Sequence, residues 1–363
     1  MVYRADQLGS LLRPAKLLEA RAARAAGRMT LEQLRELEDK AILDALEMQR
    51  ETGIQVFTDG EYRRSTFRSG FAEAVEGTVQ AESGRHWSSQ SIGAQGDTER
   101  VVGGKLRQIC RLTAHESAFL KQHAPGPCKV TVPSAGYMGC RAYRRGITDK
   151  VYPAVADLLR DIVVIIRGEI SALIEEGVSY VQLDAPGYAA FVDETQRQRM
   201  REDGVDLDRA FEEFLMADNQ SVQGLRRDGV TLAIHICRGN SRSNWHSQGG
   251  YEPIAEKLFD RLAIDTFLLE YDTERAGGFE PLRFVPKGKH VVLGLITTKQ
   301  GRLEPQDELI RRIDEASKYV PIENLSLSPQ CGFASGAAGN LITWDEQRRK
   351  LELVAQTARK VWG

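Results

Sequence analysis

The sequence has no apolar run near the roughly 18 residues that a membrane-spanning helix needs. Its first ten residues, MVYRADQLGS, lack the basic and apolar regions of a signal peptide. Lys and Arg number 49 and Asp and Glu number 51, so the formal net charge of −2 gives no attraction to nucleic acid or anionic membranes. We therefore expect a cytoplasmic globular protein without a nucleic-acid or membrane partner.

Cysteine is also scarce. The chain has five cysteines, an odd number, spread widely over 363 residues: Cys110, Cys128, Cys140, Cys237 and Cys331. This distribution argues against a disulfide framework. A cysteine with a function in this chain is expected to bind a metal or to act as a thiolate.

The chain repeats one unit, in which a short apolar run ends at a polar or glycine-containing tip. The eight runs are ADQLGS (5–10), QVFTDGE (55–61), CKVTVPSAG (128–136), VSYVQLDAPG (178–187), TLAIHICRGN (231–240), DTFLLEYD (265–272), HVVLGLITT (290–298) and LSLSPQCGF (325–333). Helical periodicity lies between them, as in 155–173, which Gly177 ends. Continuous apolar strands joined by helices predict an α/β fold, a (β/α)₈ TIM barrel, as a single domain over 1–363. A doubly wound open sheet is the alternative.

One stretch, 78–113, interrupts this alternation of strand and helix. Glycine and serine separate two possible β segments within it. This pattern predicts a β-hairpin inserted in a βα loop of the barrel.

The polar tips predict where the chemistry lies, because active sites of such barrels collect at the carboxyl ends of the strands. His235 and Cys237 follow the run VTLAI and are one residue apart, so in an extended segment they project to the same side. They form two potential ligands for a soft metal. The alternative is a hydrogen-bonded core histidine beside an inert buried thiol.

Two further strand ends extend this metal hypothesis. Glu270 lies inside the run FLLEYD, and Cys331 lies in the turn of SPQCGF. Two thiolates, one imidazole and one carboxylate suit tetrahedral Zn²⁺ better than Mg²⁺ or Ca²⁺. The alternatives are a salt bridge from Glu270 to Arg238 or Arg275, and simple packing for Cys331.

Arginines beyond the first two strand tips are candidates for binding an anionic group. Arg13 follows the first tip, and Arg63, Arg64 and Arg68 follow the second. A guanidinium there suits a carboxylate, sulfonate or phosphate, although most such arginines are surface charges. His246 lies in a glycine- and serine-rich loop and is a candidate lid residue or proton donor, with an exposed loop histidine as the favoured interpretation.

Five motifs carry a family resemblance: TDGEYRR, VQLDAPG, HICRGN, FLLEYD and SPQCGF. In this order they resemble the catalytic C-terminal barrel of cobalamin-independent methionine synthase, from LGS near the start to the last helix. The resemblance implies a TIM barrel that binds zinc and methylates a thiol. It implies a small-molecule thiol substrate and an alkyl donor as partners.

The resemblance also implies site residues. The Zn²⁺ ligands would be His235, Cys237, Glu270 and Cys331. By the same match Ser10 would contact the carboxylate of an amino-acid thiol such as homocysteine, and Glu61 and Asp184 would hold its ammonium group.

The sequence departs from that family at the residues expected to bind and protonate the methyl donor. Thr297 and Thr298 stand where the family has an Asp-x-His unit, and SAGYMG (134–139) replaces the expected folate-stacking tryptophan. These departures predict that methyltetrahydrofolate is a poor methyl donor, because a proton relay and an aromatic surface are missing.

Three functions remain open at this point. The first is zinc-dependent alkylation of a thiol, with methyl transfer to homocysteine as the leading form. The second is epoxide opening like that of the related epoxyalkane:coenzyme M transferase, or a reaction of the uroporphyrinogen-decarboxylase type. The third is a non-catalytic zinc-binding barrel, which predicts a closed metal site.

Overall fold

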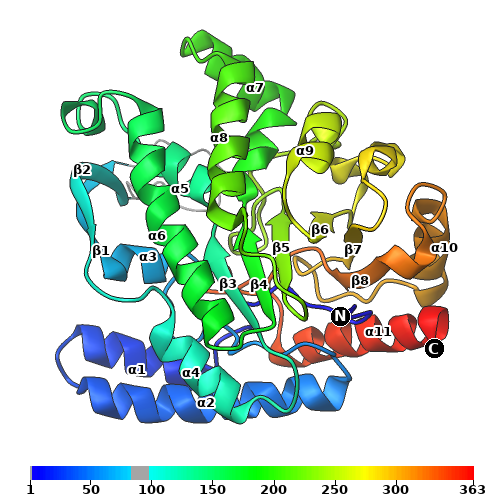
Figure 1. The fold of residues 1–363 in the computed structure, drawn as a ribbon. Coiled ribbons are helices and arrows are strands. Elements are labelled where there is room, and N and C mark those ends of the chain that lie inside the picture. The colour runs from blue at the N-terminus through cyan, green and yellow to red at the C-terminus, as the bar shows by residue number, and fades with distance from the viewer. Residues whose placement is uncertain (1, 83–97) are drawn as a thin grey trace.

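The computed structural model describes residues 2–82 and 98–363 and is organised around parallel strands (Figure 1). Six of them form one sheet in chain order: β3 (Lys129–Pro133), β4 (Tyr180–Asp184), β5 (Thr231–Ile236), β6 (Thr266–Glu270), β7 (His290–Ile296) and β8 (Leu325–Pro329). All five pairings are parallel. Every residue of these strands is buried, which explains why they read as continuous rather than alternating apolar runs.

Two N-terminal segments close this sheet into a barrel. Ala5 forms a parallel bridge with Leu327 of β8, and Phe57 forms one with Cys128 at the start of β3. The two segments also meet each other, because the amide of Gln55 donates to the carbonyl of Ala5 at 3.1 Å. The predicted (β/α)₈ barrel is therefore confirmed, and the open sheet is wrong because β8 and β3 are both paired on their outer sides. The first two runs pair through isolated bridges rather than through full strands.

Helices surround the strands (Figure 1). The described α-helices are α1 (Ala15–Ala25), α2 (Leu31–Thr52), α3 (Ser69–Ala74), α4 (Ala114–His123), α5 (Ala135–Ala142), α6 (Val155–Glu175), α7 (Glu194–Glu202), α8 (Leu207–Val222), α9 (Ala255–Arg261), α10 (Gln306–Ala316) and α11 (Trp344–Trp362). Helix α6 matches the periodicity of its sequence, and Gly177 follows it with a φ of +89°, the left-handed conformation that ends helices. Arg4 lies over the ring of Trp362, so the two ends of the barrel domain are neighbours.

The predicted hairpin is present. Strands β1 (Val75–Glu82) and β2 (Thr98–Gln108) pair antiparallel, and the part of the predicted segment at 83–97 lies outside the described residues. Val101 and Val102 are buried, and the hydroxyl of Thr148 donates to the carbonyl of Val102 at 2.7 Å. These contacts fix the hairpin to the barrel.

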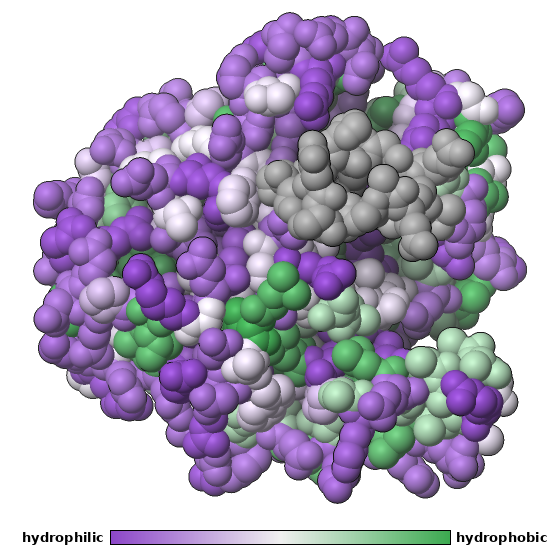
Figure 2. All heavy atoms as spheres, turned by 180° about the vertical axis from the view of Figure 1, so that it is seen from behind, coloured by the Kyte–Doolittle hydropathy of each residue, from purple (hydrophilic) through white to green (hydrophobic). Residues whose placement is uncertain are grey.

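The charged side chains that the composition provides lie mainly on the surface. The face opposite to that of Figure 1 is largely hydrophilic, with separate hydrophobic groups between the polar ones (Figure 2). No helix among the described residues is long and apolar enough to cross a membrane.

Candidate metal and substrate site

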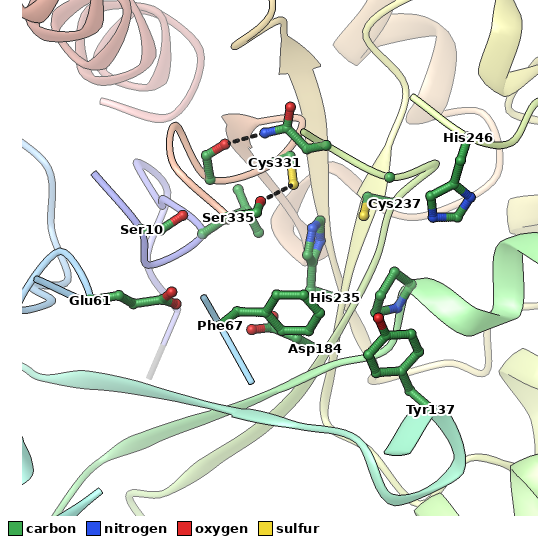
Figure 3. A pocket seen from close by; sticks show the side chains of 15 residues that line it. Ser10, Glu61, Phe67, Tyr137, Asp184, His235, Cys237, His246, Cys331 and Ser335 are labelled. Atoms are coloured by element: carbon green, nitrogen blue, oxygen red, sulfur yellow. Dashed lines mark hydrogen bonds between the residues drawn. The ribbon is translucent and has the colours of Figure 1, made fainter. Parts of the chain in front are cut away.

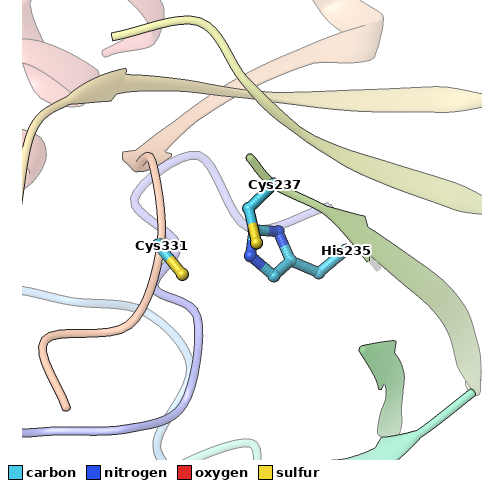
Figure 4. A group of neighbouring side chains, drawn as sticks. All are labelled: His235, Cys237 and Cys331. Carbon is cyan, nitrogen blue, oxygen red and sulfur yellow. The ribbon is translucent and has the colours of Figure 1, made fainter. Parts of the chain in front are cut away.

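Three potential metal ligands meet at the carboxyl ends of β5 and β8. His235 is the second-to-last residue of β5, Cys237 follows that strand, and Cys331 comes two residues after β8. Their ligand atoms all lie within 4.8 Å of one another, and each residue is 5% exposed. Figure 4 shows the imidazole and the two thiols turned toward a common point. We call these three residues the sulfur side of the site.

The histidine is oriented as a ligand needs to be. Its Nδ1 lies 3.3 Å from the carbonyl of Leu268, which accepts a hydrogen bond, so Nδ1 carries the proton. Its Nε2 is buried and has no hydrogen-bond partner. An unpaired buried nitrogen is costly unless something binds its lone pair, and a metal ion fits that requirement.

The two thiols have different proton affinities. The hydrogen bond from Cys237, together with His235, lowers the pKa of Cys331 well below its ordinary value. Cys237, which shares that hydrogen bond, has a raised pKa. Cys331 is thus the thiol that most readily becomes a thiolate. Two sulfurs and one imidazole are a donor set that fits Zn²⁺.

Glu270, the fourth predicted ligand, lies outside this group. Its carboxylate is fully buried, accepts the backbone N–H of Arg238 at 2.7 Å and pairs with the guanidinium of Arg275. The salt bridge considered from the sequence is therefore present. Glu270 as a metal ligand stays a prediction, and binding a metal would require its carboxylate to turn from Arg275.

A pocket of about 60 Å³ opens beside the sulfur side. Ser10, Glu61 and Asp184 line it together with the three potential ligands, and we call these three the carboxylate side. Figure 3 shows Glu61 and Asp184 pointing into the same space as His235 and Cys331. All three members of the carboxylate side are buried.

The two carboxylates differ from ordinary surface acids. One oxygen of Glu61 accepts from the hydroxyl of Thr131 at 2.8 Å, while the other has no partner. Asp184 accepts from the side-chain amide of Gln182 at 2.8 Å. Burial raises the pKa of Asp184 to about 7, against the opposing charge of His235. The first oxygen of Glu61 is also 3.8 Å from the guanidinium of Arg64, and its other oxygen, buried and unpaired, is suited to binding a further cation.

Arg13 does not line this pocket. It is buried, and its guanidinium donates to the carbonyls of Glu61 at 2.7 Å and of Arg64 at 2.8 Å. These contacts hold the backbone of Glu61, which has an unusual positive φ of 57°. Its predicted role as a substrate ligand stays a prediction, and the structure gives it contacts that position Glu61.

Comparison with known proteins identifies the family of the chain. The sequence model of the family "Cobalamin-independent synthase, Catalytic domain" matches residues 5–360. The chain belongs to this family. It is 38% identical to the uncharacterized protein YxjG of Bacillus subtilis (strain 168), over 99% of this chain and 95% of that protein.

More distant relatives are described as methionine synthases. The chain is 24% identical to a methionine synthase of Pyrococcus abyssi (strain GE5 / Orsay), over 90% of this chain and 85% of that protein. The crystal structure of a putative vitamin-B12 independent methionine synthase from Listeria monocytogenes superposes with a TM-score of 0.77. It is 29% identical and covers 99% of this chain and 98% of its own. The family match includes every residue of the two sides of the site.

The sequence did not indicate two aromatic residues that line the pocket. Phe67 and Tyr137 line the pocket and stack with ring centres 5.6 Å apart. The expectation that an aromatic surface is missing is therefore wrong. Tyr137 stands inside SAGYMG itself, but its partner is 70 positions earlier in the chain, so no local pattern pairs them.

The favoured interpretation of His246 is also wrong. The residue is half-buried and lines the pocket, and its Nδ1 lies 2.8 Å from the hydroxyl of Ser247. It approaches Gly239 so closely that a Cβ there would meet its ring at 2.3 Å. The loop composition that suggested exposure gives no information about this contact.

Proposed function

We propose that this protein is a zinc-dependent thiol alkyltransferase, with methyl transfer to homocysteine or a similar amino-acid thiol as its reaction. One observation carries the proposal: a pocket in this family's barrel has soft metal ligands and buried carboxylates on its walls. A sulfur atom suits the first set and an ammonium group suits the second. A small amino-acid thiol has both groups.

His235, Cys237 and Cys331 would hold the ion, with Glu270 as the proposed fourth ligand. Zn²⁺ supplies acidity to a coordinating thiol, which is then deprotonated at neutral pH and nucleophilic. Two thiolates and a carboxylate offset the charge of the ion, so the site favours an electron-rich sulfur over activation of water.

The carboxylate side would orient the substrate. Glu61 and Asp184 bind the ammonium group, and the hydroxyl of Ser10 donates to the carboxylate. Because these residues are buried, each contact is formed in a place that excludes water and is stronger than on the surface. Holding the amino-acid end fixes the direction of the sulfur, which is the usual gain from positioning a reactant.

The alternatives fit less well. Coenzyme M has a sulfonate and no amino group, so two buried carboxylates would oppose its binding. A non-catalytic zinc barrel predicts ligands without accessible space, whereas a cavity of about 60 Å³ adjoins these ligands. Both alternatives remain outcomes of the experiment below.

The test is product formation by the zinc-loaded protein. Homocysteine and coenzyme M would each be incubated with methyltetrahydrofolate, methylcobalamin, S-methylmethionine and epoxypropane, with products identified by mass spectrometry. We expect methionine from homocysteine with at least one methyl donor. Product from coenzyme M and epoxypropane alone would support the epoxide alternative.

A second measurement separates an enzyme from a scaffold. X-ray absorption at the zinc edge reports whether an added thiol contributes a sulfur ligand. We expect one additional sulfur with homocysteine. No additional sulfur with either thiol would favour the non-catalytic barrel.

A further inference from the structure

Lys299 is a buried lysine that follows β7, and no sequence motif drew attention to it. Strand β7 lies between β6, which ends at Glu270, and β8, which leads to Cys331. The side chain of Lys299 is 8% exposed. It therefore stands among the strand ends that carry the proposed ligands.

The contacts of Lys299 are with oxygen atoms that have no formal charge. Its Nζ donates to the carbonyl of Gly239 at 3.2 Å and lies 3.4 Å from Oδ1 of Asn240. Gly239 and Asn240 both line the pocket, and the side-chain amide of Asn240 donates to the carbonyl of Gly332, next to Cys331. Lys299 thus lies behind the pocket wall that joins the loops of Cys237 and Cys331.

Comparison with other buried lysines shows what Lys299 lacks. Among the described residues Lys129, Lys299 and Lys350 are buried. Lys129 pairs with Asp6 at 2.6 Å, and Lys350 pairs with Glu304 at 3.2 Å. Lys299 has no such ion pair in 2–82 or 98–363. The buried carboxylates of Glu270 and Asp272 lie near enough for the charge of Lys299 to oppose the rise that burial causes in the pKa of each, so the ammonium is stabilised through space and not by a direct ion pair.

The neighbouring acid already has other partners. Glu270 pairs with Arg275 and accepts from the amide of Arg238. Burial would raise the pKa of Glu270, but the charges of Lys299, Arg275 and Arg238 together hold it below its ordinary value. Lys299 is therefore one of three positive charges that act on Glu270, and it is the one that also lies behind the pocket wall. Its charge also acts on Cys331, which faces the pocket.

We propose that Lys299 is a positioning residue for substrate, whose buried charge favours a thiol that binds as its anion over a neutral sulfur ligand. The inference rests on the proposed function and adds a determinant of selectivity to it. Two thiolates and a carboxylate around Zn²⁺ would give the four ligands and the ion a net charge of about −1, and a substrate thiolate would make that set more negative. A positive charge behind the wall offsets that addition.

The test compares ligands that differ in charge at sulfur. Zinc-loaded wild type, K299Q, K299M and K299R would be titrated by calorimetry with homocysteine and with methionine, whose thioether is neutral. Zinc affinity would be measured separately by competition with a chromophoric chelator. K299Q keeps an N–H donor and removes the charge, whereas K299R keeps the charge.

We expect K299Q and K299M to bind homocysteine about tenfold more weakly, as loss of one opposite charge in a partly screened interior predicts. Methionine binding should change less than twofold, and zinc affinity should not fall, because removing a positive charge does not weaken cation binding. K299R should resemble wild type. If one uncharged variant fails to fold, the other gives the same comparison.

Other results overturn the inference. Equal losses for homocysteine and methionine, with weaker zinc binding, would mean that Lys299 only maintains the loops. Unchanged homocysteine binding in both uncharged variants would exclude the charge effect. Absence of homocysteine binding to wild type would overturn the proposed function itself, and is distinguished by that fact from a failure of Lys299 alone.

Discussion

The two sides of the pocket are built differently. The residues of the sulfur side stand at the ends of β5 and β8, two strands of the six-stranded parallel sheet, although the pairing of β8 with β7 is irregular between Gly294 and Ile296. On the carboxylate side, Ser10 and Glu61 come from the two N-terminal segments that pair only through isolated bridges. Glycine conformations shape those segments, with φ of +118° at Gly9 and +68° at Gly60. Asp184 is the member of the carboxylate side that ends a strand of the sheet, so the sulfur side depends on the sheet, whereas Ser10 and Glu61 depend on turns.

Glycines pack closely against both sides of the pocket. A Cβ on Gly9 would lie 2.8 Å from the Thr131 side chain and 3.1 Å from Glu61. A Cβ on Gly332 would lie 2.0 Å from the hydroxyl of Ser10. Gly239, two residues after Cys237, would bring a Cβ within 2.3 Å of His246, so both sides depend on glycines that let backbone and side chain approach closely. Mutations on the sulfur side are expected to lower zinc affinity, whereas mutations on the carboxylate side are expected to lower substrate affinity.

The largest effect is expected from the sulfur side. Replacing Cys237 or Cys331 by serine should lower zinc affinity by more than about 100-fold, because a hydroxyl is a poor ligand for a soft metal. Atomic absorption of the purified variants measures the zinc content. Replacing the exposed Cys110 by serine is the matched control and should leave zinc at the wild-type level.

The barrel should remain folded in these variants. Its large core does not depend on the ion, unlike that of a zinc finger. Circular dichroism should therefore show wild-type helical signal with and without a chelator. Full zinc in both cysteine variants would contradict the assignment of the sulfur side, and loss of helical signal after chelation would contradict the independence of the fold.

A smaller effect is expected from the carboxylate side. Asp184→Asn should weaken homocysteine binding about 10- to 100-fold, the usual value of a hydrogen bond to a charged group. Zinc content should stay unchanged, and 3-mercaptopropionate, which has no amino group, should bind no worse than to wild type. Calorimetry with the two thiols measures this. A parallel loss for both thiols would show that the variant damages the whole pocket.

The pH dependence of the same side has a definite sign. Because burial raises the pKa of Asp184 to about 7, the carboxyl is protonated below that pH and loses its charge. Homocysteine affinity should fall as pH decreases through about 7. A raised carboxyl pKa stabilises the fold at low pH, and this contribution is lost as pH rises through about 7. That contribution is fully present only below the ordinary aspartate pKa of 3.8, so Asp184→Asn should gain stability relative to wild type as pH rises from 3.8 to about 8, measured by thermal unfolding.

The sequence predicted the sulfur side and the carboxylate side by different means. Strand and helix periodicity located the strand ends, and the spacing of His235 and Cys237 follows from strand geometry. Cys331 is nearly 100 residues away, and only the barrel topology brings it to that histidine. The roles of Ser10, Glu61 and Asp184 rested on family resemblance, because turns such as those at Gly9 and Gly60 have no periodic signal.

The remaining differences concern side-chain partners. The charge of a buried carboxylate such as Glu270 can be balanced by an arginine or by a metal ion. The sequence offers both partners and does not decide between them. The structure has the pair with Arg275. Arg13 was considered for the substrate, yet its donors are used by backbone carbonyls. Hydrogen-bond partners of buried groups depend on three-dimensional contacts that residue order does not encode locally.

Another prediction tests whether Glu270 is a metal ligand. If Glu270 is the fourth ligand, Glu270→Gln should lower zinc affinity about tenfold or more, and Arg275→Met should raise it, because the carboxylate no longer has to leave its arginine. Chelator competition measures both. The opposite outcome, weaker zinc binding in Arg275→Met and no change in Glu270→Gln, would make Glu270 a structural residue that belongs to neither side.

The smallest effect is expected at the aromatic pair. Phe67 and Tyr137 line the pocket, and a planar donor such as a folate would find an aromatic surface there. Tyr137→Ala should weaken folate binding about three- to tenfold, the usual value of one aromatic contact, and should leave S-methylmethionine binding unchanged. Tyr137→Phe keeps the ring and is the matched control.

The absence of histidine at Thr297 and Thr298 still predicts slow methyl transfer from methyltetrahydrofolate, because its leaving group needs a proton. Folate binding measured by fluorescence quenching, beside turnover with the same compound, separates the two effects. Tight folate binding with slow turnover would agree with the aromatic contact and with the missing proton donor. Rapid turnover in wild type would contradict the predicted lack of a proton donor and would point to another acid in this pocket.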